Sequence, residues 1–165
     1  MNPDFLDILV FSLDGQRHGV PVAEVQELLP ALAIMPVPNA GFLERGFEGV
    51  INLRGGIVPV LSLRRRFGMP VKGVALTDHF IVLRLHDRLT AVHVDQALEL
   101  ARLDPAAIAD VDTVDAREAG ARVAKVGDGL ILLHRAQDLL ALASQRNLTE
   151  IGPTPARAAE KEVGP

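Results

Sequence analysis

The clearest pattern of hydrophobic and polar positions lies in the middle of the chain, at residues 47–68. Two short apolar runs, at 50–53 and 57–61, are separated by Arg54 and a Gly-Gly pair. This pattern predicts a β-hairpin, because glycine readily adopts the positive φ angles that tight hairpin turns require. Apolar residues then alternate with three arginines, which predicts a short helix ending at Gly68. Arg54 is therefore expected at the tip of a hairpin braced by buried strands, a position that suits recognition better than a core.

Similar patterns predict further short strands on both sides of this hairpin. Residues 5–13 carry apolar side chains on both faces, as in a strand that is buried on both sides or closed into a barrel. The turns between strands are indicated by Asp14-Gly15, His86-Asp87 and Gly127-Asp128-Gly129. Besides the central hairpin, strands are expected at 5–13, 17–20, 78–85, 89–94, 97–103, 121–126 and 130–133.

Two further helices are expected from the spacing of apolar residues. Pro21 can begin a helix, and the apolar positions that follow it predict one over 22–29. Leucines among good helix formers predict a closing helix over 134–145. Prolines make the segment after residue 30 extended or looped, and residues 104–120 are expected to be a loop with one helical turn from Pro105.

The turn-rich segment 68–73 predicts a joint between two lobes. We therefore expect one folded domain, 5–145, with lobes at about 5–72 and 73–145 that can exchange edge strands. Many short strands with frequent turns predict a barrel or a sandwich, and periodicity alone does not choose between them. From Arg146 onward the apolar content falls while prolines, glycines and mixed charges accumulate, which predicts a disordered tail at 146–165.

Composition narrows the classes of function. The chain has 165 residues, 48% of them apolar, and no cysteine, which predicts one globular domain without disulfides or thiol chemistry. A formal charge of −4 and the absence of Tyr and Trp argue against a nucleic-acid partner, because such partners select basic faces and stacking rings. The longest apolar stretch, 28–38, contains prolines and is too short for membrane insertion. No export signal opens the chain, which is compatible with a cytoplasmic location.

No pattern in the sequence indicates catalysis or a bound cofactor. The chain lacks a Gly-x-Ser-x-Gly elbow, a Walker-type lysine loop and a G-x-G-x-x-G run. None of the serines lies in a pattern that would activate its hydroxyl. His86 and His93 flank a predicted hairpin near Asp95, but no metal-ligand spacing such as H-x-x-x-H connects them. We therefore expect no enzyme, no cofactor and no metal site.

The run GVINLRGGIVPVLSLRRRFG, at 49–68, resembles the signature of the CheW-like domain, the adaptor fold of bacterial chemosensory arrays. The upstream stretch ILVFSLDGQRHGVPVAEVQELL is similar to the opening hairpin of that family and its short V-x-E-V/I segment, and AVHVDQALEL is similar to its V-D-x-V strand pair. The resemblance extends from about Phe5 to about Ala143. It implies a mainly β fold of two adjacent five-stranded SH3-like barrels with a few short helices.

The resemblance also implies a function. It implies a non-catalytic scaffold that couples the cytoplasmic tips of methyl-accepting chemoreceptors to the regulatory domain of a CheA-type histidine kinase, in the cytoplasm at membrane-bound receptor arrays. An adaptor of a chemosensory pathway that controls pili or another non-flagellar output is the alternative within the family. A small-ligand-binding or enzymatic β-barrel is the alternative outside it. Ser62 stands where the family commonly has aspartate, and His18 where an aromatic residue is common, so the identity of the partners stays open.

The candidate protein-binding site is centred on two charged residues. Arg54 matches the arginine of the family motif that is implicated in docking, and its guanidinium suits a carboxylate or backbone carbonyls on a partner. The alternative is a surface arginine that caps a turn. Glu27 is expected near the same surface, where it can pair with Arg54 when no partner is bound, or as an ordinary surface glutamate. The full set is Val25, Glu27, Asn52, Leu53, Arg54 and Gly55.

Neighbouring residues have two interpretations each. Some apolar side chains near the hairpin are expected either in the core or along a groove between the barrels that receives a helical receptor tip. These are Val25, Leu28, Ile51 and Leu53. The arginines at 64–66 are expected as a solvated helix face, or as a patch that steers acidic partners toward the hairpin.

Overall fold

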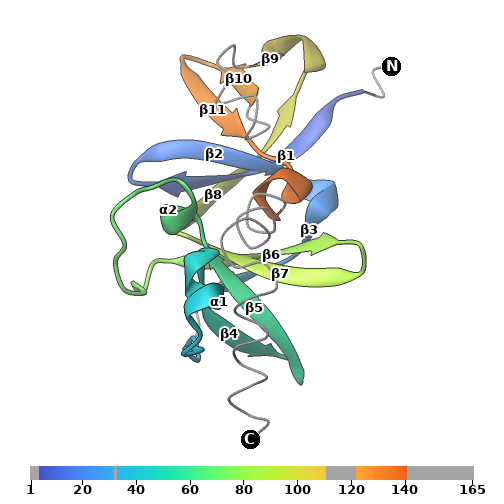
Figure 1. Ribbon diagram of the computed structural model, residues 1–165. Helices are drawn as coiled ribbons and strands as arrows, with labels where there is room; N and C mark the ends of the chain where they lie inside the picture. Colours follow the sequence, from blue (N-terminus) through green and yellow to red (C-terminus); the bar gives the residue numbers. More distant parts are fainter. Residues whose placement is uncertain (1–3, 32, 111–121, 141–165) are drawn as a thin grey trace, which may run out of the picture.

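The structure, a computed structural model, describes residues 4–31, 33–110 and 122–140. In these ranges the chain forms two curled β-sheets with short helices between and beside them (Figure 1). The predicted tail at 146–165, much of the loop expected at 104–120 and the second part of the helix expected at 134–145 lie outside the described residues.

One sheet has six strands and the other has five. The six-stranded sheet has the spatial order β8 (Gln96–Leu103), β1 (Leu6–Leu13), β2 (Gln16–Pro21), β11 (Gly129–Leu133), β10 (Arg122–Val126), β9 (Ile108–Asp110). The five-stranded sheet has the order β3 (Val25–Pro30), β6 (His79–Leu85), β7 (Arg88–Val94), β5 (Gly56–Ser62), β4 (Phe47–Leu53). Most neighbours are antiparallel, and the pairs β2–β11 and β5–β7 are parallel over two or three residues.

The predicted hairpin turns are all present. Positive φ angles occur at Asp14 and Gly15, at Arg54 and Gly55, and at His86 and Asp87. Such angles in both central residues are the geometry of the type I′ turn, whose twist matches that of the two strands it joins. Local turn chemistry therefore determined these hairpins.

The short helices agree with the sequence in part. The helix predicted before Gly68 is α2 (Leu63–Arg66), and the helical turn at Pro105 is η2 (Pro105–Ala107). Residues 136–140 are helical, within the predicted closing helix. The helix α1 (Ala40–Glu44) and the three-residue strand β9 were not predicted.

The helix predicted over 22–29 is wrong. The chain forms a single 3₁₀ turn, η1 (Val22–Glu24), and then the edge strand β3 beside β6. In β3 the side chains alternate between half-buried and exposed, and the half-buried ones are Val25, Glu27 and Leu29. Backbone pairing with β6 outweighs the helical spacing of the apolar residues, because a short apolar run fits either structure until tertiary contacts decide.

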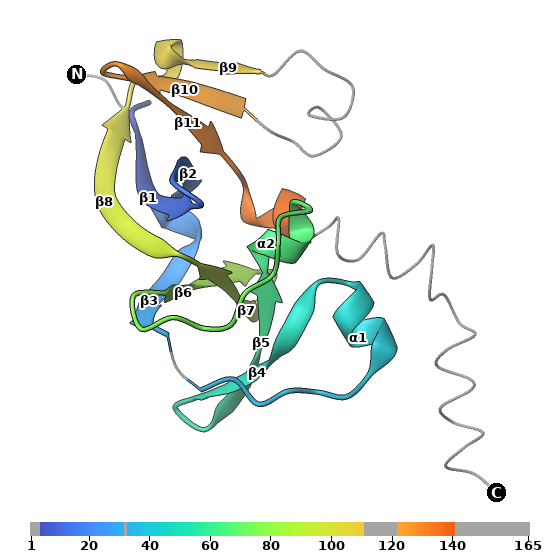
Figure 2. The same cartoon turned by 90° about the vertical axis from the view of Figure 1, so that its left-hand side faces the viewer.

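The sheets do not divide the chain at the predicted joint, 68–73. Residues 25–94 supply the whole five-stranded sheet, whereas the six-stranded sheet takes its strands from 6–21 and 96–133 (Figures 1 and 2). One lobe is thus inserted into the other. Each half of the sequence contains good hairpins, but the pairings β1–β8 and β2–β11 join segments far apart in the chain, and no local pattern indicates them.

Buried apolar side chains in the described residues form three clusters. One lies within the six-stranded sheet and one within the five-stranded sheet. The third joins the two sheets and includes Phe11 and Leu83, together with Ala136 and Leu139 of the helical segment 136–140. Strand β1 supplies Ile8 and Val10 to the first cluster and Leu9, Phe11 and Leu13 to the third, so the prediction of two apolar faces is confirmed. The lobes therefore share a core and pack as one unit.

Candidate functional site

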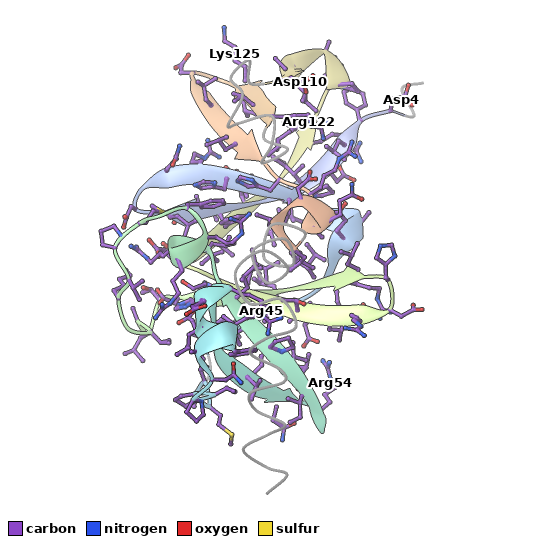
Figure 3. All side chains as sticks on the ribbon, in the orientation of Figure 1. Asp4, Arg45, Arg54, Asp110, Arg122 and Lys125 are labelled. Atoms are coloured by element: carbon purple, nitrogen blue, oxygen red, sulfur yellow. The ribbon has the colours of Figure 1, made fainter. Side chains whose placement is uncertain are left out.

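The candidate site lies at the free end of the β4–β5 hairpin. Arg54 and Gly55 form the turn, with φ angles of 50° and 84°. The side-chain oxygen of Asn52 accepts a hydrogen bond from the backbone N–H of Gly55 at 2.8 Å, which fixes the turn from below. Figure 3 shows Arg54 projecting from this tip, at the end of the molecule away from β9 and β10. The prediction that Arg54 stands at the tip of a hairpin is confirmed.

Arg54 and Glu27 form a two-point ion pair. Guanidinium Nη1 donates to Oε1 of Glu27 at 2.6 Å, and Nη2 donates to Oε2 at 2.7 Å. The side chain of Arg54 is 72% exposed and that of Glu27 is 21% exposed. The hydrogen bonds and charge of Glu27 raise the pKa of Arg54 above its ordinary value. The predicted pairing is therefore present, and it leaves much of the guanidinium open to solvent.

This pair bridges the two edges of the five-stranded sheet. Glu27 lies on β3 and Arg54 follows β4, and these are the two edge strands. The edge of β4 is covered nearby by the segment after β3, where Met35 and Val50 exchange two backbone hydrogen bonds of 2.8 and 2.9 Å. Gly49 makes this approach possible, because a Cβ atom there would lie 2.2 Å from the carbonyl oxygen of Met35. The candidate site therefore lies where the two edge strands of the sheet, β3 and β4, approach each other.

The apolar candidates occupy different environments. Val25 is half-buried against the cluster that joins the sheets, whereas Leu53 packs against the interior of the five-stranded sheet. Ile51 is 2% exposed and is a core residue, so it does not line a groove. Leu28 is 41% exposed on β3. The structure brings together Glu27, Asn52, Arg54 and Gly55 at the tip, but not Val25 and Leu53 on one surface.

The arginines at 64–66 do not form a uniformly solvated face. Arg64 is buried and connects the two lobes: its guanidinium donates to Asp14 at 2.6 Å, to both oxygens of Asp95 at 2.7 and 3.1 Å, and to the carbonyl of Pro70. Burial opposes the charge of Arg64, but the hydrogen bonds that it donates to Asp14 and Asp95, and the charges of these carboxylates, outweigh burial and raise the pKa of Arg64. Sequence reasoning missed this role because the acceptors lie far away in the chain.

Two histidine clusters are also internal. The ring nitrogens of His93 lie 2.7 Å from Glu48 and 2.7 Å from Asp78, an arrangement that favours the protonated ring, because only that form can donate from both nitrogens. Burial lowers the pKa of His93, and the two carboxylates outweigh this and raise it. His18 and His134 share a hydrogen bond of 2.9 Å. Burial lowers the pKa of His18 to about 4 and that of His134 to about 3, so both are neutral.

Neither cluster forms a recognisable metal centre. Within the residues that the structure describes, no group of three or more His, Asp or Glu side chains is arranged to hold a metal ion. In the same residues, no helix is long and apolar enough to cross a membrane.

Comparison with known proteins identifies the family. The model of the CheW-like domain matches residues 7–144. The chain belongs to the CheW-like domain family. The chemotaxis protein CheW of Helicobacter pylori is 24% identical over 144 residues, which cover 84% of each chain. That of Thermotoga maritima is 33% identical over 98 residues, which cover 59% of this chain and 62% of the relative.

A solved CheW structure has the same fold. The scaffolding protein TtCheW from Thermoanaerobacter tengcongensis superposes with a TM-score of 0.72 at 28% identity, over 84% of this chain and 89% of that one. The expected class of fold, two adjacent SH3-like barrels, is therefore confirmed. One of the two sheets has a sixth strand, the short β9.

Ser62 and His18, the two residues that depart from the CheW-like pattern, make contacts that the more common residues could also make. The hydroxyl of Ser62 caps α2 by accepting a hydrogen bond from the N–H of Arg65 at 3.2 Å. Serine and aspartate are both good helix N-caps, so either residue fulfils this role. The His18 ring is stacked between Phe11 and Phe67, with ring centroids 5.5 and 5.6 Å away. Histidine thus keeps a flat ring at this position, stacked on both phenylalanines.

Proposed function

We propose that this chain is a non-catalytic chemotaxis adaptor that couples chemoreceptor tips to the regulatory domain of a CheA-type histidine kinase. The support is the CheW-like family membership, the relatives named as chemotaxis protein CheW, and the similarity to a scaffolding protein. The observation that carries the proposal is the exposed guanidinium of Arg54, which stands in the family motif on a preorganised turn.

The geometry suggests how the tip binds. Arg54 is held in a two-point contact with Glu27, so it is already oriented as a fork that fits a carboxylate or paired carbonyls. An exposed ion pair contributes little to stability, so the exchange of Glu27 for a partner's acceptor is inexpensive for the fold. In this proposal Glu27, Asn52 and Gly55 orient the arginine, whereas Val25 and Leu53 pack against two different clusters and act only through the fold.

Two related barrels on this chain and on the kinase domain allow pseudo-symmetric packing, a geometry that closes into rings. No reaction is then needed for signalling. The receptor state has only to change the relative stability of alternative packings, by about 1–3 kcal/mol, which is typical of allosteric coupling. The adaptor would act in the cytoplasm, recruited to membrane-bound receptor arrays. A fluorescent fusion of the protein should therefore gather in clusters at these arrays, and the clusters should disappear in cells that lack the receptors.

The direct test is a pull-down with a receptor-tip fragment and a kinase regulatory domain. The wild type should bind both, and Arg54→Glu should weaken at least one interaction about tenfold or more. Arg102→Glu is the matched control, because Arg102 is a similarly exposed arginine, 68%, paired with Asp7 on the other sheet. A wild type that binds neither fragment would refute the function. Unchanged binding by Arg54→Glu would refute the site.

A further inference from the structure

A largely apolar groove with a volume of about 660 Å³ lies on the five-stranded lobe, between the hairpins β4–β5 and β6–β7. The two hairpins run apart toward their turns (Figure 1). Strand β5 pairs with β7 from Val60 to Ser62, and Pro59, just before this ladder, has no N–H with which to extend it. The strands therefore part at Pro59, and side chains from both of them line the groove. Its volume is in the range of small-molecule sites, about 300–1,000 Å³.

Apolar side chains form most of the wall of this groove. They are Phe47, Ile57, Pro59, Leu85, Leu89 and Leu140. Ile57 is 70% exposed although β5 is a central strand of its sheet, so a large apolar side chain faces solvent here. The Phe47 ring is stacked on Phe42, with ring centroids 4.8 Å apart, which makes that part of the wall rigid. A ligand that covers these side chains would remove apolar surface from water, which is favourable.

The charged and titratable side chains that line the groove are all basic. They are Arg45, His86 and Arg88. The chain as a whole has a formal charge of −4, so a lining without a carboxylate departs from its composition. Within the described residues, Arg45 and Arg88 form no ion pair. By contrast, two other exposed arginines, Arg54 and Arg102, each pair with a carboxylate. The groove therefore lacks a counter-charge.

Arg45 is held in place at the groove. Its Nε donates to the carbonyl oxygen of Gly41 at 3.2 Å, and its guanidinium carbon lies 5.7 Å from the centre of the Phe47 ring. These contacts use Nε and one face of the guanidinium, so Nη1 and Nη2 keep donors for a ligand. Figure 3 shows Arg45 on this lobe, beside α1.

We propose that the groove binds a small organic anion, a carboxylate with an apolar body. The apolar body covers Ile57 and its apolar neighbours, and the carboxylate accepts hydrogen bonds from Arg45 or Arg88. A cation with the same apolar body would instead be repelled by the two arginines. Arg54 does not line the groove, so this site is separate from the hairpin tip.

Three probes separate the effect of charge from that of the apolar body: decanoate, decyltrimethylammonium and acetate. Titrated into the full chain and followed by NMR, decanoate should bind with a dissociation constant of about 1 mM or lower. It should shift the signals of Ile57 and Leu140 but not those of Leu130, which is 64% exposed on β11 of the other sheet. The other two probes should bind about tenfold more weakly or worse. No binding of decanoate, equal binding of the cation, or equal shifts at Leu130 would overturn the proposal.

Substitutions in the groove provide a second test. Arg45→Met with Arg88→Met removes both charges but keeps apolar stems, and should weaken decanoate binding about tenfold or more, whereas Arg102→Met should not. Ile57→Asn should also weaken it, with Leu130→Asn as the control; both positions are exposed, so neither change should unfold the protein. Unchanged affinity in either groove variant would contradict the proposal. Neither test involves a receptor or a kinase, so both are independent of the proposed adaptor function.

Discussion

Arg54 and Glu27 join opposite edges of the five-stranded sheet through two parallel hydrogen bonds of 2.6 and 2.7 Å. If the pair serves recognition, a partner must meet the positive charge at position 54, and an ion pair with the two charges exchanged cannot replace it. The exchange Arg54→Glu with Glu27→Arg should therefore keep the ion pair and the unfolding free energy but lower partner affinity about tenfold or more, measured by titration calorimetry. Swapping the exposed pair of Asp7 and Arg102 should leave affinity unchanged. If the exchange of Arg54 and Glu27 left partner affinity at the wild-type value, the pair would act by stabilising the fold and not by contacting the partner.

Arg64 should contribute strongly to stability. Arg64→Met would leave Asp14 and Asp95 facing each other without their shared cation, at a position where the Arg64 side chain is 8% exposed. We expect the unfolding free energy to fall by about 2–4 kcal/mol in urea titration. Arg65→Met, the neighbouring change on the exposed side of α2, should stay within about 0.5 kcal/mol of the wild type. Similar losses of unfolding free energy for both variants would show that the contacts of Arg64 with Asp14 and Asp95 do not stabilise the fold.

Gly49 should tolerate no side chain. The Cβ atom of alanine would lie 2.2 Å from the carbonyl oxygen of Met35 and 2.7 Å from Ile34, so the segment along β4 must move. Gly49→Ala should lower the unfolding free energy by about 1–3 kcal/mol. Gly73→Ala is the control, because nothing lies within 4 Å of the added atom. Its stability should change by less than about 0.5 kcal/mol, and an equal loss would contradict the packing at β4.

Stability should decrease in acid because of His18 and His134. Both are buried and neutral, with pKa values lowered to about 4 and about 3, whereas an unfolded histidine has a pKa of about 6.5. Below pH 6.5 the unfolded chain therefore binds protons that the folded chain does not. The unfolding free energy should decrease by on the order of 2 kcal/mol per histidine between pH 7 and pH 4.5.

The substitution His18→Phe separates this effect from general acid unfolding. Phenylalanine retains the stacking on Phe11 and Phe67 but does not titrate. Its stability profile should be flatter between pH 7 and pH 4.5, measured by thermal unfolding across buffers. A profile parallel to that of the wild type would show that the buried pair does not dominate.

His93 should have the opposite effect in alkali. Its folded pKa is raised, so its contribution is fully present below the unfolded value of about 6.5 and is lost as pH increases through the folded pKa. The slope should not exceed about 1.4 kcal/mol per pH unit for one proton. His93→Gln should be less stable at pH 6 and should lack this alkaline slope. An unchanged slope would assign it to another group.

The sequence predicts local structure better than long-range structure here. The turns at Asp14, Arg54 and His86 were predicted because two adjacent residues determine each of them. The Arg54–Glu27 pair was predicted only because the family resemblance placed both residues near one surface. Strand β3 was predicted as a helix, because its pairing with β6 involves a segment about fifty residues later that no local pattern reveals.

Buried charges show the same limit. Arg64 lies in a run of three arginines whose members look alike in the sequence, yet it alone of the three is buried between acidic partners from the other lobe and from the strand junction at Asp95. The partners of His93, Glu48 and Asp78, likewise come from two other segments. Such roles depend on which strands meet, and the sequence leaves that undetermined.

The insertion of residues 25–94 between the strands of the other sheet has a consequence for how such adaptors can recombine. The inserted lobe is a cassette whose two junctions, near Glu24 and Asp95, must be exchanged together. A chimera joined once, near residue 72, would take strands of both sheets from different parents. A cassette transplanted whole would keep every strand pair, provided that the recipient offers Arg64 the two carboxylates it requires.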